Sequence, residues 1–239
     1  MIKLAISGAQ GRMGQAITQL ALSGSDFKVA VLLEHINHPK NRETVNGIKI
    51  STDNNVLKGC QVLIEFTLPE GTMENLKAAV KYKIPMVIGT TGFTTAQIQE
   101  IKKASKIIPI VLSTNMSIGV NTLFKMIEIA GSKIDPVHIS LTETHHIHKK
   151  DKPSGTAKTM AEVAEKFSGL KLAEISSIRE GEVIGDHTIR FESNEDVLTI
   201  SHHAKDRSMF AKGALTAAKF LQNKSPGLYN MQDVLGFNK

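Results

Sequence analysis

The first half of the chain alternates short apolar runs with segments whose apolar residues recur at helical spacing. The apolar runs predict strands at residues 2–7, 28–33, 61–66, 86–88 and 107–112. The helical spacing predicts helices at residues 13–23, 73–82 and 97–105. Buried strands that alternate with helices are typical of a parallel sheet with helices on both faces. This half therefore predicts an α/β fold.

The pattern changes in the second half, where apolar and polar residues alternate with a period of two. Ile139 and Leu141 alternate with Ser140 and Thr142, which predicts a strand with one solvated face. Residues 187–192 and 197–201 flank a polar turn and predict an antiparallel hairpin, with a helix at 154–167 among these strands. A final helix at 210–222 leads back to the first domain. We therefore expect one domain of residues 1–117 and 208–239, and an inserted α+β domain of residues 118–207.

The composition narrows the classes of partner. With 41% hydrophobic and 22% charged residues, the chain has the composition of an ordinary globular protein. The net charge of +6 fits a solvated basic surface, a nucleic-acid partner or an anionic small molecule. The lysines are spread along the chain and no tryptophan is available for base stacking, so we expect no nucleic-acid partner. We expect no membrane helix, because no long uncharged apolar run occurs, and the single cysteine, Cys60, fits a cytoplasmic location.

Three glycines follow the first predicted strand and open the first predicted helix. Gly8, Gly11 and Gly14 have the spacing G-x-x-G-x-x-G, a relaxed form of the dinucleotide fingerprint. Such a turn brings the backbone close to a pyrophosphate, and the helix N-terminus attracts its charge. Glu34 ends the second strand, where a carboxylate accepts hydrogen bonds from ribose hydroxyls. The pattern favours a dinucleotide cofactor, and the alternative is that the glycines serve an ordinary tight turn.

Two further loops each follow a predicted strand of this domain. They contain Gly89, Thr90, Thr91 and Gly92, and Ser113, Thr114, Asn115 and Met116. Ligands of open parallel sheets bind beyond the carboxyl ends of the strands, so we expect both loops to border the nicotinamide. Each loop is also compatible with a simple turn.

Histidines and lysines crowd residues 143–156, a segment that leaves a strand and enters a helix. Its sequence is ETHHIHKKDKPSGT. Clustered histidines can bind a metal, but the neighbouring ammonium groups would oppose a cation, and we expect no metal. A solvated basic loop is a second alternative. We favour an anion-binding catalytic loop, in which histidine or lysine transfers a proton. The backbone N–H groups of Ser154, Gly155 and Thr156 open the following helix and are placed to hold a carboxylate.

The segment 143–156 resembles the E-x-H-H-x-x-K-x-D-x-P-S-G-T signature of the dihydrodipicolinate reductases. Similar pieces occur in the expected order: GAQGRMG at 8–14, EFT at 65–67, GTTG at 89–92, NMSIGVN at 115–121 and GDHT at 185–188. The resemblance spans nearly the whole chain. It implies a Rossmann-like dinucleotide domain that contains both termini, and an inserted substrate-binding domain that also builds a homotetramer.

The resemblance also implies a reaction and its residues. NADH or NADPH would donate a hydride to a small dicarboxylate substrate, dihydrodipicolinate, and a proton would complete its reduction to tetrahydrodipicolinate in diaminopimelate and lysine biosynthesis. His145 would donate or accept the proton and Lys149 would donate it. Substrate contacts are implied for His146, Ser154, Gly155 and Thr156. Cofactor contacts are implied for Gly8, Ala9, Gln10, Gly11, Arg12, Met13, Glu34, Gly89, Thr90, Thr91, Ser113, Thr114, Asn115 and Met116.

Some positions depart from this pattern. His35 follows Glu34 where some relatives have an arginine for the 2′-phosphate of NADPH, so the choice between NADH and NADPH stays open. A nicotinamide-dependent dehydrogenase acting on aspartate is an alternative, although the pairing of His-His-x-x-Lys with Pro-Ser-Gly-Thr argues against it. A non-catalytic dinucleotide sensor is another, and it would need neither His145 nor Lys149.

Overall fold

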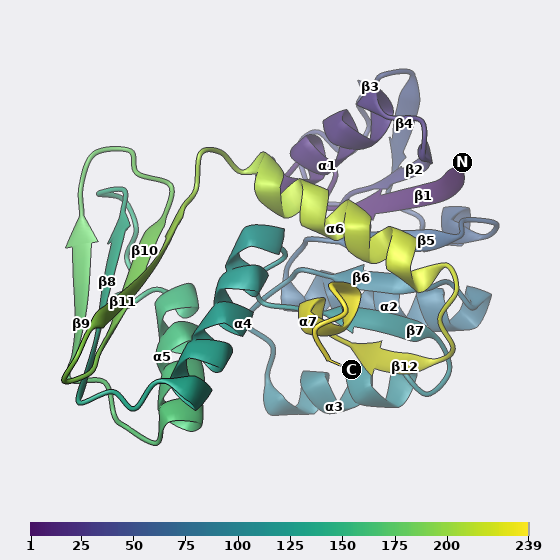
Figure 1. Ribbon diagram of the computed structural model, residues 1–239. Coiled ribbons are helices and arrows are strands. Elements are labelled where there is room, and N and C mark those ends of the chain that lie inside the picture. Colours follow the sequence, from purple (N-terminus) through teal and green to yellow (C-terminus); the bar gives the residue numbers. More distant parts are fainter. Residues whose placement is uncertain (239) are drawn as a thin grey trace. The chain divides into compact units, whose positions relative to one another are not determined.

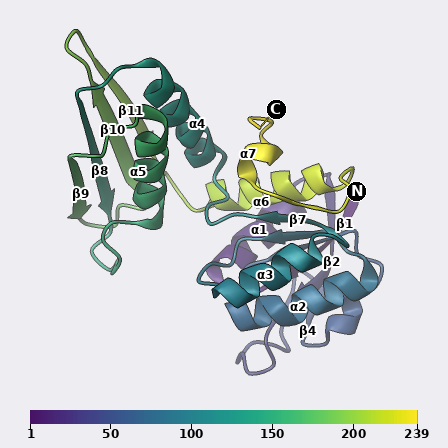
Figure 2. The same cartoon turned by 90° about the horizontal axis from the view of Figure 1, so that it is seen from below.

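The computed structural model describes residues 1–238, and the chain divides into two compact units (Figures 1 and 2). The first unit comprises Met1–Ser117 and the segment that begins at Phe210, and the second unit is Ile118–Met209. Among residues 1–238, no helix combines the length and the apolar character needed to span a bilayer.

An eight-stranded sheet forms the frame of the first unit. Its strand order is β12-β7-β6-β5-β1-β2-β4-β3, and all neighbours are parallel except β3 and β4. The chain runs outward in both directions from β1, which makes the end of β1 a switch point where ligands bind. The elements are β1 (Ile2–Ser7), α1 (Arg12–Ser23), β2 (Phe27–Leu33), β3 (Thr44–Val45), β4 (Ile48–Ser51), η1 (Asn54–Leu57), β5 (Val62–Glu65), α2 (Pro69–Tyr82), β6 (Met86–Ile88), α3 (Thr95–Ala104), β7 (Pro109–Leu112), α6 (Ser208–Leu221), β12 (Gly227–Tyr229) and α7 (Met231–Val234).

Two apolar clusters cover the two faces of this sheet. On one face, Leu4 and Ile6 of β1 pack with residues of α1 and α6. On the other face, Leu63 of β5 packs with residues of α2 and α3. Strands buried on both faces explain the continuous apolar runs in the sequence. Helix α6 comes close to the chain after β7, because a Cβ built on Gly213 would lie 1.6 Å from the Met116 carbonyl oxygen. Helix α6 therefore packs against the first sheet.

A four-stranded sheet, in the order β11-β10-β8-β9, carries the second unit. Strand β8 pairs antiparallel with β10 and parallel with β9, and β10 pairs antiparallel with β11. The helices α4 and α5 pack on one face of this sheet around Ile139, Leu141 and Phe191. The elements are α4 (Ile118–Lys133), β8 (His138–His145), α5 (Gly155–Ser168), β9 (Glu174–Arg179), β10 (Asp186–Glu192) and β11 (Val197–His203).

The predicted class, a Rossmann-like parallel sheet followed by an α+β unit, is confirmed. The sequence-based prediction assigned no helix to residues 118–133 and no strand to residues 174–179, and the structure has α4 and β9 there. Strand β9 is an edge strand with the sequence EISSIR, which contains only two apolar residues. Pairing with β8 stabilises it, and that long-range contact leaves little trace in the local pattern.

Candidate functional site

The glycine-rich turn after β1 is too tight for side chains. Gly8 has a φ of 76°, and a Cβ on it would lie 2.4 Å from the Phe66 carbonyl oxygen. A Cβ on Gly14 would lie 2.1 Å from the Gly8 carbonyl oxygen. Gly11 is the N-cap of α1, and neither a side-chain cap nor an acidic residue occupies the first turn. The N-terminus of α1 thus offers its N–H groups and its positive dipole end to an anion, as a dinucleotide pyrophosphate requires.

Glu34 lies directly against this turn. Its carboxylate accepts hydrogen bonds from the backbone N–H groups of Gln10, at 2.9 Å, and His35, at 3.0 Å. The side-chain amide of Gln10 donates to the Glu43 carboxylate at 3.1 Å. The predicted ribose-binding carboxylate is therefore held beside the predicted phosphate-binding backbone.

The loop after β6 is fixed by hydroxyl groups. The buried Thr90 Oγ1 accepts from the Thr67 backbone N–H at 3.1 Å and from Thr72 Oγ1 at 2.9 Å. A Cβ on Gly89 would lie 2.2 Å from the Phe66 ring. Thr91, one residue further, is exposed. These contacts set the backbone of the predicted cofactor loop and leave the side chain of Thr91 accessible.

The loop after β7 has its own internal hydrogen bonds. Ser113 Oγ donates to the Asn115 carbonyl at 2.8 Å, and Asn115 Oδ1 accepts from the Ser117 N–H at 2.9 Å. The Met116 side chain is only 2% exposed and belongs to the apolar core, whereas Thr114 is exposed. The turn after β1 and the loops after β2, β6 and β7 all lie at the carboxyl edge of the parallel sheet.

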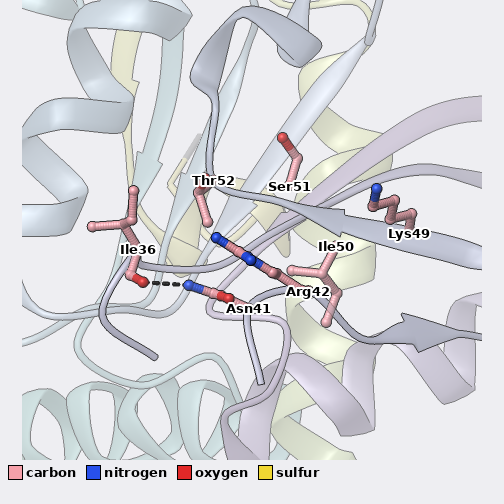
Figure 3. A pocket seen from close by; sticks show the side chains of 7 residues that line it. All are labelled: Ile36, Asn41, Arg42, Lys49, Ile50, Ser51 and Thr52. Carbon is pink, nitrogen blue, oxygen red and sulfur yellow. Dashed lines mark hydrogen bonds between the residues drawn. The ribbon is translucent and has the colours of Figure 1, made fainter. Parts of the chain in front are cut away.

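A hollow lies at the carboxyl end of β4 (Figure 3). The Glu34 N–H donates to the Ser51 carbonyl at 3.0 Å, which places the end of β4 beside the end of β2. The Arg42 side chain extends into the hollow toward Ile36 and Thr52 (Figure 3). Within residues 1–238, neither Arg42 nor Lys49 forms an ion pair. The sequence-based prediction did not single out Arg42. The lining residues are Ile36, Asn41, Arg42, Lys49, Ile50, Ser51 and Thr52.

In the second unit, one face of β8 changes from apolar to ionisable along the strand. The first buried residues of this face are apolar, and Glu143 and His145 occupy its last two positions. The register places His187 of β10 opposite Glu143, and Arg179 of β9 opposite His145. Three strands thus bring together the four residues that we call the ionisable cluster: Glu143, His145, Arg179 and His187.

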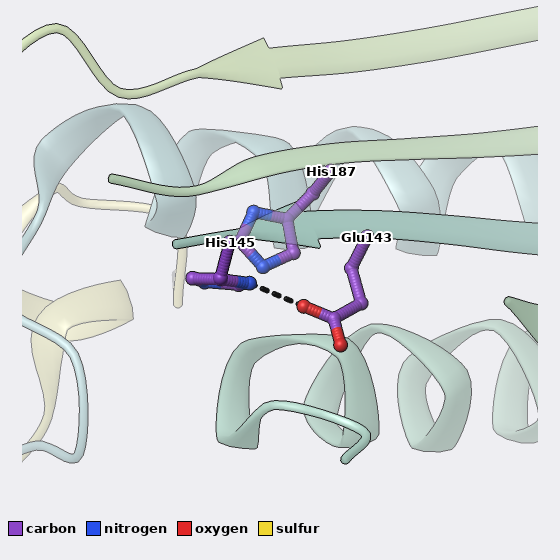
Figure 4. A group of neighbouring side chains, drawn as sticks. All are labelled: Glu143, His145 and His187. Carbon is purple, nitrogen blue, oxygen red and sulfur yellow. Dashed lines mark hydrogen bonds and ion pairs between the residues drawn. The ribbon is translucent and has the colours of Figure 1, made fainter. Parts of the chain in front are cut away.

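Glu143 is the carboxylate of this cluster, and it points toward the His145 ring (Figure 4). It is fully buried, bonds His145 Nδ1 and forms a 2.9 Å ion pair between its Oε1 and Arg179 Nη1. Burial raises the pKa of Glu143, but hydrogen bonds from Ser177, Arg179 and His145 outweigh burial and hold that pKa below its ordinary value. Glu143 is therefore ionised near neutral pH, and its carboxylate accepts a hydrogen bond from the Nδ1–H group of His145.

This bond sets the chemistry of His145. With its proton held on Nδ1, the neutral ring presents a lone pair on Nε2. Nε2 faces Gly185, where an added Cβ would approach it to 3.0 Å. Burial lowers the pKa of His145, and Glu143 offsets part of this effect. The lone pair of His145 Nε2 can therefore accept a proton.

His187 packs edge-on against the His145 ring, with 5.1 Å between the ring centroids. Its Nε2 lies 3.3 Å from Ser154 Oγ. Burial, followed by the charge of His145, lowers the pKa of His187 to about 4. His187 is therefore neutral at physiological pH, and it packs against His145 as a polar but uncharged ring.

The loop that carries Lys149 is attached to the cluster through Arg179. Arg179 Nε donates to the Lys149 carbonyl at 3.2 Å, and Nη2 donates to the Asp151 carbonyl. The Lys149 ammonium lies 2.8 Å from the Asp151 carboxylate. Burial raises the pKa of Asp151, but the hydrogen bond and charge of Lys149 outweigh burial, so that pKa lies below its ordinary value. The half-buried Lys149 thus has an ionised partner on its own loop.

Helix α5 begins at the end of the same segment. Ser154 is its buried N-cap, and Ser154 Oγ accepts from the Ala157 N–H at 3.1 Å. The exposed Gly155 opens the helix, and a Cβ built on it meets nothing within 4 Å. His146 and Thr156, the other predicted carboxylate ligands, are both half-buried on this segment. The start of α5 therefore offers a positive helix end with room for an anion.

Ligand atoms of Glu143, His145 and His187 also lie within 4.8 Å of one another, as metal ligands would. However, the carboxylate of Glu143 is paired with Arg179, and Lys149 acts electrostatically on His145. Two positive charges oppose a cation here, so the cluster is better suited to holding and transferring a proton.

The sequence-based prediction missed three members of the ionisable cluster as site residues: Glu143, Arg179 and His187. Glu143 could have been found, because its spacing of two from His145 puts both on one face of a strand. Arg179 could not, because the strand that carries it was not predicted.

Two family models match the chain. The one described as "Dihydrodipicolinate reductase, N-terminus" matches residues 2–116, and the one described as "Dihydrodipicolinate reductase, C-terminus" matches residues 119–235. Curated proteins named 4-hydroxy-tetrahydrodipicolinate reductase are similar over the full length. The one from Polynucleobacter necessarius is 40% identical over 100% of both chains, and the one from Methanocaldococcus jannaschii is 38% identical over 100% of this chain and 99% of its own.

Solved structures show the same fold. A dipicolinate-bound dihydrodipicolinate reductase from Paenisporosarcina sp. TG-14 superposes with a TM-score of 0.85, at 21% identity, over 98% of each chain. An aspartate dehydrogenase from Thermotoga maritima superposes less closely, with a TM-score of 0.56 at 12% identity, over 94% of this chain and 98% of its own. The reductase, rather than the aspartate dehydrogenase, matches this architecture more closely.

Proposed function

The chain belongs to the dihydrodipicolinate reductase family, and we propose that it reduces 4-hydroxy-tetrahydrodipicolinate to tetrahydrodipicolinate. The hydride comes from NADH or NADPH, the solvent supplies a proton, and the 4-hydroxyl group of the substrate leaves as water. The reaction serves diaminopimelate and lysine biosynthesis in the cytoplasm. One observation in the second unit supports this activity most directly. Segment 143–156 carries a proton-exchanging histidine, a lysine and an open helix N-terminus, the groups that reduction of a dicarboxylate requires.

The substrate carboxylates bind at the start of α5. The helix N-terminus attracts anions, and the open space at Gly155 lets a carboxylate approach the backbone N–H groups. His146 and Thr156 add side-chain contacts. The hydroxyl of Ser154 caps the helix, so this residue contributes by holding the helix start in place.

His145 and Lys149 are the catalytic residues in this proposal. His145 Nε2 donates or accepts the proton, because Glu143 holds the other ring nitrogen. The Lys149 ammonium donates a proton and attracts the substrate carboxylates. The reduced nicotinamide, when bound, supplies the hydride.

The residues that hold the cofactor are those at the carboxyl edge of the first sheet. The backbone of Gly8, Ala9, Gln10, Gly11, Arg12 and Met13 surrounds the pyrophosphate, and Glu34 accepts from the ribose. The loops with Gly89, Thr90 and Thr91, and with Ser113, Thr114, Asn115 and Met116, border the nicotinamide. The absence of room for a Cβ at Gly8 and Gly14 supports this role, since the backbone must lie close to the phosphates.

Both NADH and NADPH are accepted in this proposal. Glu34 serves the free ribose hydroxyls of NADH. Arg42, which extends into the hollow beside Glu34 without an ion-pair partner in the described chain, serves the 2′-phosphate of NADPH. An arginine in this place compensates for His35.

The second unit also assembles the protein into a homotetramer in this proposal. Its two helices pack on one face of the sheet, and the other face presents side chains such as Ile178, 42% exposed, and Val197, 45% exposed. Light scattering coupled to size-exclusion chromatography measures the assembly. A single peak at the monomer mass would contradict the tetramer without touching the proposed activity.

The reductase activity is tested by mixing the protein with freshly made product of dihydrodipicolinate synthase and either reduced nucleotide. Loss of absorbance by the reduced nicotinamide is the expected result. Absence of oxidation with both nucleotides would overturn the proposed function. A parallel assay with aspartate and the oxidised nucleotides identifies an aspartate dehydrogenase instead.

A further inference from the structure

We propose that Arg179 is a positioning residue that fixes His145 and the Lys149 loop in one arrangement through a single guanidinium. The inference rests on the proposed function, since it assigns Arg179 to the two proton-transferring residues named there. It concerns a residue on the edge strand β9, outside segment 143–156.

The guanidinium contacts both parts of the site. Nη1 forms the 2.9 Å ion pair with Glu143, the residue that holds His145 Nδ1. Nε and Nη2 donate to the carbonyls of Lys149 and Asp151 in the loop. Nη1 also donates to the carbonyl of Ile178 at 2.6 Å. The side chain is 8% exposed, so these partners replace water around a buried charge.

The geometry of these bonds requires an arginine. One edge of the planar group faces the Glu143 carboxylate, while other N–H groups reach two carbonyls of the loop. A lysine has one nitrogen at the end of a flexible chain and cannot reach all of these acceptors together. Replacing Arg179 by lysine therefore keeps the charge and loses the connection between β8 and the loop.

Arg179 also sets the proton balance of the cluster. The charged and titratable groups that act on His145 are Glu143, Lys149, Arg179 and His187. Arg179 stabilises the Glu143 carboxylate and disfavours a proton on His145. Without the positive charge of Arg179, a proton on His145 would be less disfavoured, and the pKa of His145 would rise. Loss of Arg179 and loss of Glu143 therefore change the pKa of His145 in opposite directions: the first raises it and the second lowers it.

Kinetics of Arg179→Gln and Arg179→Lys form the first test, with Arg190→Gln as the matched control. Arg190 lies on the neighbouring strand β10 and is exposed. We expect both Arg179 variants to lower kcat about 10- to 100-fold, with a smaller rise in KM for the substrate. The control should keep wild-type kinetics. An unchanged kcat in Arg179→Gln, or a change confined to KM, would overturn the proposal.

The second test needs neither substrate nor turnover, so it separates this inference from the proposed function. NMR titration of isotope-labelled histidine follows the ring nitrogens of His145, assigned by their loss in His145→Asn. The pKa of His145 should rise in Arg179→Gln, fall in Glu143→Gln and stay unchanged in Arg190→Gln. If Arg179→Gln does not fold, amide exchange of residues 146–152 in Arg179→Lys should still accelerate. An unchanged pKa of His145 in folded Arg179→Gln, or unchanged amide exchange in Arg179→Lys, would show that Arg179 does not position His145 and the loop.

Discussion

The two candidate sites of this protein differ in the groups that form them: one consists mainly of backbone and the other of side chains. In the first unit, the surface that faces the proposed cofactor is largely backbone, shaped by glycines where a Cβ would lie 2.1 to 2.4 Å from a carbonyl oxygen. In the second unit, the site consists of side chains contributed by three strands and a loop. An added Cβ should therefore disrupt the first site, whereas removal of a charged side chain should disrupt the second.

This difference follows from what each site has to recognise. A pyrophosphate is bound by N–H groups that every residue carries, so only close approach matters. Proton transfer requires side chains of defined ionisation, so burial and neighbouring charges matter. Substitutions in the first unit should therefore change cofactor affinity, and those in the second should change turnover. Four predictions test this contrast.

The largest effect is expected for Lys149→Ala, which removes a proposed proton donor. Turnover should fall by a factor on the order of 10² to 10⁴, while the Kd for the reduced nucleotide stays the same. Steady-state kinetics and a separate nucleotide titration measure the two quantities. Lys150→Ala, at the exposed neighbouring residue, is the control and should remain within about twofold of wild type. Undiminished turnover in Lys149→Ala would remove this residue from the mechanism.

Gly14→Ala should show the opposite signature. Alanine usually favours a helix over glycine, but here the Cβ would lie 2.1 Å from the Gly8 carbonyl oxygen. We expect the Kd for the reduced nucleotide to rise at least about tenfold and the free energy of unfolding to fall by about 1–3 kcal/mol. Calorimetric titration and urea unfolding measure these changes. Gly24→Ala is the control: the nearest atom to its Cβ would be 3.9 Å away, so neither the Kd nor the free energy of unfolding should change. Equal binding by both variants would contradict the backbone cradle.

His187 links the second site to the stability of the fold. Its pKa falls from an ordinary 6.5 to about 4 on folding, so the unfolded chain takes up the proton first as the pH drops. The contribution of His187 to the free energy of unfolding is therefore fully present above pH 6.5, and it is lost as the pH falls toward 4. When the pH is lowered from 7.5 to 5, the free energy of unfolding of the wild type should fall by about 2 kcal/mol more than that of His187→Gln, as measured by urea unfolding. The exposed His138→Gln is the control, and identical pH slopes for wild type and His187→Gln would refute the burial argument.

The smallest effect concerns the choice of nucleotide. Arg42→Gln should weaken NADPH about fivefold, equivalent to about 1 kcal/mol at an exposed site, and leave NADH unchanged. His35→Arg should strengthen NADPH by a similar factor. Lys40→Gln, an exposed residue of the same loop, is the control. Equal losses for both nucleotides in Arg42→Gln would show that the hollow does not distinguish the 2′-phosphate.

Sequence patterns located the elements that depend on nearby residues. The strand, glycine turn and helix at the N-terminus follow from local apolar periodicity and from the steric needs of Gly8 and Gly14. The cap of α5 is also local, because the Ser154 hydroxyl bonds an N–H group three residues later. Residues close in sequence are close in space, so their spacing is informative.

The remaining features depend on contacts between distant segments. Arg179 meets Glu143 because β9 pairs in parallel with β8, and His187 meets it because β10 pairs antiparallel on the other side. Arg42 reaches its hollow because β4 ends beside β2. Strand register is set by the packing of whole faces, which no short motif encodes.

The sequence by itself therefore determined the α/β class, the glycine turn and the segment 143–156 with its histidines and lysines. Only the tertiary structure decided which groups control His145: a buried glutamate, an arginine from an edge strand and a second, neutral histidine. The physical reason is that spacing along a chain fixes backbone geometry locally. Ionisation depends on burial and on charges that folding brings within a few ångströms.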